Sequence, residues 1–271
     1  MATNADTIWN LLVTVRERQP LIHNITNFVV MNNSANALLA LGASPAMVHS
    51  CDEVEDFVSF SHALVVNIGT LYSEHIAACK LAVLRARAVG VPWILDPVGA
   101  GATSYRRTAA DALARLQPNA IRGNGSEILT LIRQAGAGKG VDSLHGSKAA
   151  LDGARLLAQE TGAVVAITGA VDYVTDGTQV TAIANGHPLM TRVTGLGCSA
   201  TAVIGAFLAV ELDPLAATVA GLAVFGVAGE MAAEQARGPG SLQVALLDAL
   251  HAMTQDDLAK RLKLEKVSLL N

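Results

Sequence analysis

The segment with the clearest chemical potential is residues 194–198 (TGLGC), which leads into an uncharged run of small and apolar residues. Two glycines before such a run predict a loop that opens a buried helix, here over residues 198–210. The first turn of a helix presents free backbone N–H groups and the positive end of the helix dipole. Phosphate is the usual anion bound there. We therefore expect an anion hole formed by Gly195, Leu196, Gly197 and Cys198.

Cys198 adds an ionisable side chain to this loop. A thiol at a helix N-terminus has its thiolate form favoured, so Cys198 is a candidate catalytic group. The structural alternative is a small buried hydrophobe on an alanine-rich helix. Residues 195–200 also match G-x-G-x-x-A, a form of the dinucleotide-binding fingerprint. That fingerprint belongs in the first βαβ unit of a chain, however, and this copy lies late in the sequence.

Four expected apolar strands end in glycine beside a polar or charged residue. The strands cover residues 63–68, 92–96, 120–122 and 163–168, and the polar residues at their ends are Thr70, Asp96, Arg122, Glu127 and Thr168. Strands that alternate with helices predict a parallel sheet covered on both faces, with ligands at the carboxyl ends of the strands. A structural alternative exists for each end, because glycine and Asp-Pro also favour turns. The four ends together predict one shared active site.

The residue types at this sheet edge favour phosphoryl transfer, which depends on positioning and on neutralising phosphate charge. Arg122 can donate a pair of hydrogen bonds to phosphate oxygens, and Thr168 can donate one. Asp96 and Glu127 are oxygen ligands of the kind that Mg²⁺ takes together with waters and phosphates. The loop at residues 195–197 can receive the transferred group.

Composition limits the function classes. Charged residues make up 15% of the 271 residues, against about 25% in an average soluble domain, so we expect part of the surface to be covered by another subunit. The net charge of −4 offers no basic surface for nucleic acid. Mean hydropathy is +0.40, but the longest uncharged apolar stretch, residues 214–229, is shorter than the about 20 residues of a membrane span.

Targeting and cysteine patterns favour the cytoplasm. Residues 1–19 carry four charged side chains and lack the apolar core of a signal peptide. Cys51, Cys79 and Cys198 are far apart in the sequence and have no zinc-ligand spacing. We expect a cytoplasmic protein in which Cys51 and Cys79 are structural.

Apolar periodicity predicts the other elements of a single domain over residues 1–271. Helices are expected at residues 6–18, 31–41, 53–61, 73–89, 105–116, 126–134, 147–161, 215–237 and 242–253. A strand is expected at 46–49, and a hairpin at 172–175 and 179–184 around Asp176-Gly177. The charged tail, about residues 256–271, is expected to be peripheral.

Six segments together resemble the hydroxyethylthiazole kinase family, over about residues 10–255. These segments are 20–27 (PLIHNITN), 39–47 (LALGASPAM), 94–101 (ILDPVGAG), 120–124 (AIRGN), 194–198 (TGLGC) and 238–241 (GPGS). The resemblance implies a ribokinase-like three-layer α/β/α fold with a mostly parallel central sheet. It implies phosphorylation of the hydroxyl of 4-methyl-5-(2-hydroxyethyl)thiazole by ATP and Mg²⁺, a step in thiamine salvage. It also implies a homotrimer with active sites at the subunit contacts.

The resemblance also implies roles for individual residues. Met47 and Gly195 would contact the thiazole, with Asn27 nearby; Arg122 and Thr168 would contact ATP; Asp96 and Glu127, the latter in an Asn124-x-x-Glu127 motif, would serve Mg²⁺ and phosphates. Cys198 stands where most ribokinase-like enzymes carry an aspartate base. Leu196 departs from the smaller residue expected in this loop.

Alternatives remain open from the residues alone. The substrate could be another small alcohol or a pyrimidine, the protein could be an NAD-dependent oxidoreductase, or it could bind a thiazole or thiamine without catalysis. Met47 taken alone is a core residue, and His23 and His49 are structural histidines. Arg106 and Arg107 are interpreted as a solvated helix start rather than a phosphate clamp.

Overall fold

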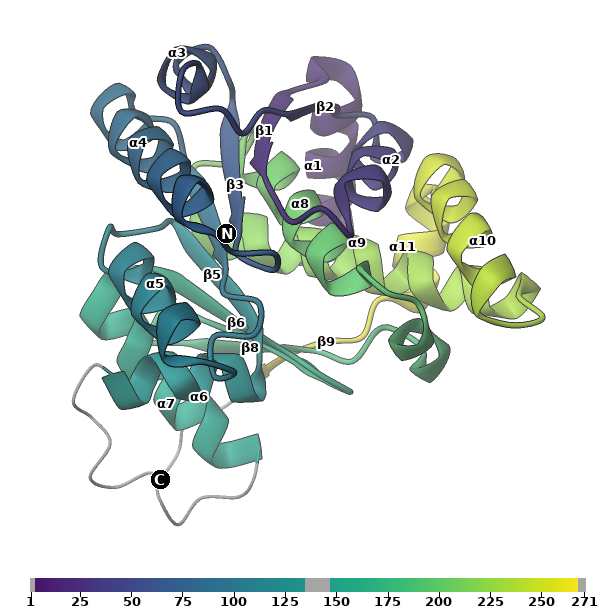
Figure 1. Cartoon of the computed structure of the whole chain (residues 1–271). Coiled ribbons are helices and arrows are strands. Elements are labelled where there is room, and N and C mark those ends of the chain that lie inside the picture. Colours follow the sequence, from purple (N-terminus) through teal and green to yellow (C-terminus); the bar gives the residue numbers. More distant parts are fainter. Residues whose placement is uncertain (1–2, 135–146, 268–271) are drawn as a thin grey trace.

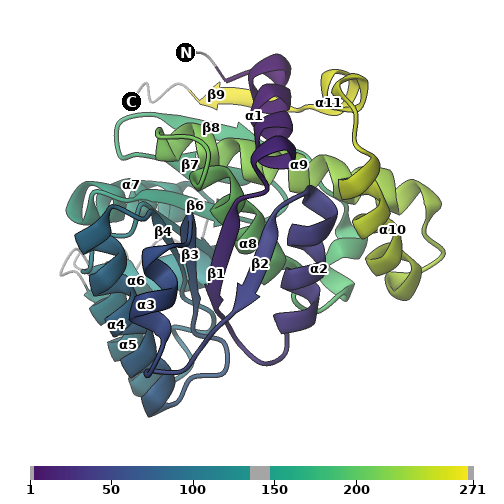
Figure 2. The same ribbon diagram turned by 90° about the horizontal axis from the view of Figure 1, so that it is seen from above.

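The computed structural model describes residues 3–134 and 147–267, which build a nine-stranded sheet between two layers of helices (Figures 1 and 2). The strand order is β2-β1-β3-β4-β5-β6-β7-β8-β9. The strands are β1 (Leu21–Ile25), β2 (Ser44–Met47), β3 (Ala63–Asn67), β4 (Trp93–Asp96), β5 (Ala120–Asn124), β6 (Val164–Thr168), β7 (Asp172–Thr175), β8 (Val180–Ile183) and β9 (Leu264–Val267).

The sheet changes character at β6. Every pairing from β2 to β6 is parallel, whereas β6-β7, β7-β8 and β8-β9 are antiparallel. The central strands carry continuous apolar runs because both of their faces are buried. The mostly parallel sheet expected from the alternation of strands and helices is confirmed.

The helices divide between the two faces of the sheet (Figure 2). One face is covered by α3 (Val54–Ser59), α4 (Ser73–Val89), α5 (Ser104–Ala114), α6 (Gly125–Gln134) and α7 (Ser147–Thr161). The other is covered by α1 (Ala5–Arg18), α2 (Met31–Leu41), α8 (Leu196–Leu208), α9 (Pro214–Gln235), α10 (Pro239–Ala252) and α11 (Gln255–Arg261). Neighbouring residues of one strand enter opposite cores: Leu64 packs under α4, and Val65 packs under α8. The expected three-layer α/β/α fold is confirmed.

Helix α9 explains the high mean hydropathy. It is long and apolar enough to cross a membrane by composition, but 78% of its most apolar window is buried within the fold. It packs between α8, α10 and the sheet. The expectation of a buried core helix at residues 214–229 is confirmed.

Two strands were not predicted. β1 has no continuous apolar run, because His23 and Asn24 occupy its centre; both are buried, and their side chains bond to the carbonyls of Val48 and Ile22. β9 lies in the charged tail and pairs antiparallel with β8, and its two central residues, Glu265 and Lys266, are both exposed. The described part of the tail therefore forms α11 and an edge strand of the sheet, and residues 268–271 lie outside the described residues.

Helix α8 points its N-terminus at the carboxyl ends of the parallel strands. It packs against β1, β3 and β4, and it begins at Leu196, two residues earlier than expected. The first turns of α8 therefore lie beside the polar residues at the strand ends, where Cys198 contacts Asn27 and Thr201 donates to Asp96. A short 3₁₀ helix, η2 (Pro188–Arg192), precedes this loop.

Candidate active site

Polar side chains from five neighbouring strands meet at one edge of the sheet. Asn27 follows β1, Asn67 ends β3, Asp96 ends β4, Arg122 lies in β5 and Thr168 ends β6. The parallel register places Asn67 beside Asp96 and aligns β5 with β6 through Asn124 and Thr168. The shared site expected from the strand ends is therefore assembled by the sheet itself.

Asp96 lies at the centre of this edge and is fully buried. Its Oδ2 accepts hydrogen bonds from Asn67 Nδ2 at 2.8 Å and from Thr201 Oγ1 at 2.9 Å. Its Oδ1 is buried and has no hydrogen-bond partner among residues 3–134 and 147–267. Burial raises the pKa of Asp96 to about 6, although the Arg122 guanidinium, with Nη1 3.9 Å from Oδ2, opposes this shift. A buried carboxylate oxygen without a partner fits a cation or an ordered water.

Arg122 connects the strand ends to the helix loop. Its Nη2 donates to Thr168 Oγ1 at 2.5 Å, and its side chain is 13% exposed. The guanidinium lies against Gly197, where an added Cβ would be 2.6 Å from Nη1. Residue 197 must therefore be glycine for the guanidinium to reach the helix N-terminus. The structure thus brings Arg122 and Thr168 together with the predicted anion hole.

The loop that opens α8 has the backbone that an anion hole requires. Gly195 is the N-cap, with a φ of 83° that favours glycine. Cys198 is the third residue of the helix, so the free N–H groups of residues 196–198 belong to its first turn. The Leu196 side chain packs into the core and borders the cavity beside Arg122, so the protein accommodates this larger residue.

Cys198 differs from the sequence expectation. Burial, and then the nearby Asp96 carboxylate, raise the pKa of the Cys198 thiol to about 12. The position at the start of α8 predicted the opposite shift, but loss of water and a neighbouring negative charge outweigh the helix terminus. Cys198 Sγ accepts a hydrogen bond from Asn27 Nδ2 at 3.6 Å. At neutral pH, Cys198 is therefore a hydrogen-bonded thiol rather than a thiolate.

Glu127 has a structural role that the sequence motif also describes. Its Oε2 accepts from the Asn124 N–H at 2.8 Å, and Asn124 Oδ1 accepts from the Glu127 N–H at 3.0 Å. This reciprocal pair is a capping box at the start of α6. The other oxygen, Oε1, accepts from the Gly99 N–H at 2.9 Å. Both oxygens of Glu127 already accept backbone N–H groups. Asp96 is therefore better suited than Glu127 to coordinate a cation directly.

Met47 and Asn27 lie toward the opposite end of the site from Thr168. Met47 is half-buried at the end of β2, where it pairs with Asn24 of β1. Asn27 is buried, and its amide reaches Asn67 and Cys198. Gly195 packs against Val30 at the start of α2. The three predicted substrate residues therefore come from β2, the segment after β1 and the loop before α8.

A cavity of about 540 Å³ opens beside Arg122 and Thr168. Its lining includes Leu196 and Gly197 of the predicted anion hole, and also Asp172, Asn185 and His187, which the sequence analysis did not select. The Asp172 carboxylate accepts from the Gly169 N–H at 2.9 Å, and burial raises its pKa to about 6. The size of this cavity and its position next to a helix N-terminus suit a phosphorylated ligand.

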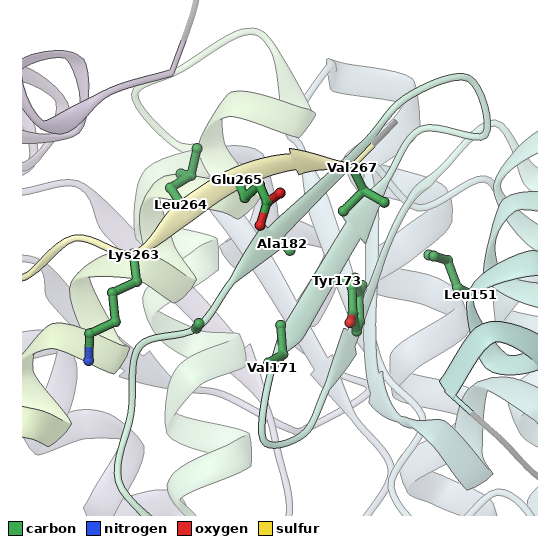
Figure 3. Close-up of a pocket in the computed structure, with 9 residues that line it drawn as sticks. Leu151, Val171, Tyr173, Ala182, Lys263, Leu264, Glu265 and Val267 are labelled. Carbon is green, nitrogen blue, oxygen red and sulfur yellow. The ribbon is translucent and has the colours of Figure 1, made fainter. Parts of the chain in front are cut away.

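A second hollow of about 600 Å³ lies elsewhere, over β7, β8 and β9 (Figure 3). Tyr173, Lys263 and Glu265 are among the described residues that line it. None of the predicted site residues borders this hollow in the described part of the chain. Of the predicted site residues, Arg122, Thr168, Leu196 and Gly197 line the cavity of about 540 Å³ instead.

Arg106 is a further residue that the sequence analysis misjudged. Its Nη1 donates to the carbonyls of Ile68 at 2.7 Å and Val98 at 3.1 Å, and its Nη2 donates to the Gly69 carbonyl at 2.6 Å. The interpretation of Arg106 as a solvated residue is wrong, because its guanidinium ties together the loops after β3 and β4. Only long-range packing shows this role, since the neighbouring Arg107 has the same local sequence context and is exposed.

Comparison with known proteins shows the family of the chain. The model of the hydroxyethylthiazole kinase family matches residues 12–256. The chain belongs to this family. It is 58% identical over 243 residues to a hydroxyethylthiazole kinase of Granulibacter bethesdensis, covering 90% of this chain and 89% of the relative. It is 50% identical over 266 residues to one from Syntrophus aciditrophicus, covering 97% and 98%.

Solved structures show the same fold. A hydroxyethylthiazole kinase protein from Pyrococcus horikoshii OT3 superposes with a TM-score of 0.89 at 42% identity, covering 97% of this chain and 100% of that one. The pyridoxal kinase of Staphylococcus aureus in complex with ADP has a TM-score of 0.61 at 15% identity, covering 78% and 88%, and shows the fold alone. The expected ribokinase-like fold is confirmed. Residues 195–200 open α8 late in this fold, not in a first βαβ unit, so they are not a dinucleotide fingerprint.

Replacing Arg106 by alanine should destabilise the fold. The Arg106→Ala variant loses three hydrogen bonds from a charged donor and leaves loop carbonyls without that donor, so we expect a loss of about 2 kcal/mol in the free energy of unfolding. Chemical denaturation measures this difference. The matched control is Arg107→Ala, which should change the same free energy by less than about 0.5 kcal/mol. Equal effects of the two substitutions would contradict the tie between the loops.

Proposed function

We propose that this hydroxyethylthiazole kinase family member transfers the γ-phosphoryl group of ATP to the hydroxyl of 4-methyl-5-(2-hydroxyethyl)thiazole, a salvage step toward thiamine. The observation that carries this proposal is the convergence of the Arg122 guanidinium, the Thr168 hydroxyl and the α8 N-terminus beside Asp96. Positive charge and N–H donors together can stabilise a phosphoryl group in the transition state of its transfer.

ATP would occupy the cavity beside Arg122 and Thr168. Arg122 already lies between Thr168 and Gly197, so its guanidinium could contact phosphate oxygens near the start of α8. The N–H groups of residues 196–198 would stabilise negative charge that develops on the transferred group. These donors are held in place by the fold, so little reorganisation is needed when the charge moves.

Asp96 would hold Mg²⁺ through its unpartnered Oδ1. When bound, the metal supplies positive charge that neutralises the phosphates. Glu127 supports the same region indirectly, since its carboxylate fixes Gly99 in the loop after β4 and caps α6. The proposed metal role of Glu127 is thus to position the loop, with any contact to the ion made through water.

The thiazole alcohol would lie near Asn27, Gly195 and Met47, with its hydroxyl toward Cys198. The Cys198 thiol is protonated at neutral pH, so it is a weak proton acceptor. A loose phosphoryl-transfer transition state asks little of a base, and the hydroxyl proton can pass late in the transfer to an oxygen of the phosphoryl group. Cys198 then contributes mainly by filling the space beside the hydroxyl and by holding Asn27 through its sulfur.

A homotrimer with shared active sites is supported by apolar residues exposed next to Asn27. Phe28 and Val29 are 58% and 60% exposed, and Phe28 stacks on Tyr72 with ring centroids 5.8 Å apart. Such a cluster suits a subunit contact. We expect sedimentation to show a trimer and Phe28→Asp to weaken it, whereas a fully active monomer of 28.0 kDa would contradict this assembly.

The free thiols of Cys51, Cys79 and Cys198 suit the proposed cytoplasmic location.

The function is tested by incubating the protein with ATP, Mg²⁺ and a panel of alcohols while measuring ADP release. We expect release with hydroxyethylthiazole and background levels with unrelated alcohols. Release with a hydroxymethylpyrimidine but not with the thiazole would assign another kinase activity. Thiazole binding without ADP release would indicate a binding protein instead.

Substitution of the two carboxylates should separate their roles. Asp96→Asn removes the charge proposed to bind Mg²⁺, so we expect kcat to fall by at least about 100-fold and the Mg²⁺ requirement to rise, with a smaller change in the thiazole KM. Glu127→Gln replaces an acceptor of a backbone N–H, so we expect a smaller fall in kcat and a stability loss of about 1 kcal/mol. Steady-state kinetics at varied Mg²⁺ measures both effects. Asp111→Asn, in an exposed ion pair with Arg115, is the control; an unchanged Mg²⁺ dependence in both site variants would remove them from the metal site.

Variants of Cys198 test whether the thiol is a base. We expect Cys198→Ala to retain activity reduced by roughly 10–100-fold, because the backbone N–H groups survive the change. Cys198→Asp should retain more activity than Cys198→Ala, since a carboxylate can accept the alcohol proton at neutral pH. When the rate of the unsubstituted protein is plotted against pH, we expect no increase with an apparent pKa near 8.5, because the pKa of Cys198 is raised to about 12.

Cys51→Ala is the control for these measurements, since Cys51 is exposed and contacts the Glu74 carbonyl. If Cys198→Ala matches the unsubstituted protein at every pH, Cys198 is only a packing residue. If Cys198→Asp is the less active variant, the site rejects a second carboxylate beside Asp96, and the comparison with aspartate-dependent kinases fails.

A further inference from the structure

Asn67 lies at the centre of the site, although the sequence analysis did not select it. It ends β3, between β1 and β4, and it is 1% exposed. We propose that Asn67 is a positioning residue that sets both the oxygen that Asp96 presents to a divalent cation and the amide that Asn27 presents to Cys198. This role rests on the proposed function, because it concerns how the site binds the metal–ATP complex and the thiazole alcohol for phosphoryl transfer.

Backbone donors fix the orientation of the Asn67 amide. The Gly69 N–H donates to Asn67 Oδ1 at 3.0 Å, and a backbone N–H can only donate. The oxygen must therefore face Gly69. The nitrogen then faces the other way, and its N–H donates to Asp96 Oδ2 at 2.8 Å. A flipped amide would lose both bonds at once.

The Asn27 amide is oriented by the same argument. The Val29 N–H donates to Asn27 Oδ1 at 3.1 Å, so Asn27 Nδ2 points into the site. One of its N–H groups donates to Asn67 Oδ1 at 2.8 Å, and the Cys198 Sγ lies 3.6 Å from the same nitrogen. Two side-chain amides in series thus connect Cys198 with Asp96, and each amide can adopt one orientation only.

This connection decides which oxygen of Asp96 is available. Oδ2 accepts from Asn67 and Thr201, so its hydrogen-bonding capacity is used within the protein. Oδ1 has no partner among the residues that the structure describes and is the oxygen left for a cation. Without the Asn67 donor, only Thr201 would hold Oδ2, and the carboxylate plane could rotate away from the orientation that leaves Oδ1 free. Asn67 therefore acts through Asp96 rather than on the cation itself.

Gly69 leaves space for the Asn27 side chain to reach Cys198, on the side of the site proposed to bind the alcohol. The Asn27 side chain packs flat on it, and an added Cβ would lie 2.5 Å from Asn27 Nδ2 and 2.7 Å from Asn27 Cγ. Alanine at this position must push the Asn27 amide away from its place beside Cys198. A substitution at Gly69 thus displaces the Asn27 amide, whereas one at Asn67 can remove the donor to Asp96.

The first variant is Asn67→Asp. Its carboxylate keeps an acceptor for Gly69 and Asn27 but replaces the donor to Asp96 by an oxygen, so the two carboxylates repel. We expect the affinity for Mn²⁺ in the presence of ADP, measured by electron paramagnetic resonance, to fall by roughly 10–100-fold, as for other partners of a metal ligand. We expect kcat to fall by a similar factor, with little change in the thiazole KM.

The second variant is Gly69→Ala, which should show the opposite pattern. Because it displaces Asn27 and leaves the bond between Asn67 and Asp96, we expect the thiazole KM to rise by roughly tenfold while Mn²⁺ affinity stays unchanged. The control is Asn119→Asp, directly before β5 and so at the opposite ends of the strands from the site. There, Asn119 Oδ1 accepts from the Trp93 N–H at 2.9 Å. It retains that acceptor, so Mn²⁺ affinity, kcat and KM should match those of the unsubstituted protein.

Thermal unfolding of each variant shows whether the protein remains folded at assay temperature. Unchanged or increased Mn²⁺ affinity in folded Asn67→Asp would overturn the proposal. Equal falls in Mn²⁺ affinity and equal rises in the thiazole KM in both site variants would also overturn it. A general loosening of the strand ends would then be enough to explain both effects. Absence of thiazole phosphorylation by the unsubstituted protein would contradict the proposed function, whereas the Mn²⁺ comparison tests Asn67 independently.

Discussion

A carboxylate without access to water, that of Asp96, is the constraint around which the site is built. An isolated buried charge is strongly disfavoured, so the fold must supply donors and positive charge nearby. Asn67 and Thr201 donate to one oxygen, and Arg122 lies 3.9 Å away. These partners come from β3, α8 and β5, so the layers of the fold must be assembled before the carboxylate is tolerated. The other oxygen is buried without a hydrogen-bond partner in the described part of the chain.

The loops at the sheet edge are held by two side chains, Arg106 and Glu127, that bond to loop backbone groups. Arg106 joins the loops after β3 and β4 through three carbonyls, and Glu127 joins Gly99 to the start of α6. Backbone N–H and C=O groups in loops need such partners when secondary structure does not provide them. Close backbone approach serves the same end at Gly197, where a missing side chain lets Arg122 reach the first turn of α8. Side chains from neighbouring elements thus tie the loops of the site to each other.

Local sequence signals were sufficient for much of the fold. The predicted bounds of α2, α4 and α7 agree with the structure, and Asp176-Gly177 forms the turn of the β7-β8 hairpin. These elements have strong periodicity or specific turn residues, so each segment carries its own signal. β1 was missed because buried polar residues such as His23 interrupt its apolar pattern, and β9 because its residues are those of a charged surface. Both strands exist because neighbouring strands pair with them, which no local pattern records.

The sequence by itself determined which residue types stand at the strand ends and at the start of α8, and their combination indicated the family. Tertiary structure decided what those residues can do. The thiol of Cys198 has a raised pKa because Asp96 and the surrounding core are brought against it from distant parts of the chain. Asn67 acquired its place between Asn27 and Asp96 in the same way, through the order of strands in the sheet. Hydrogen-bond geometry and exclusion of water depend on distances in space, and spacing along the chain does not specify those distances.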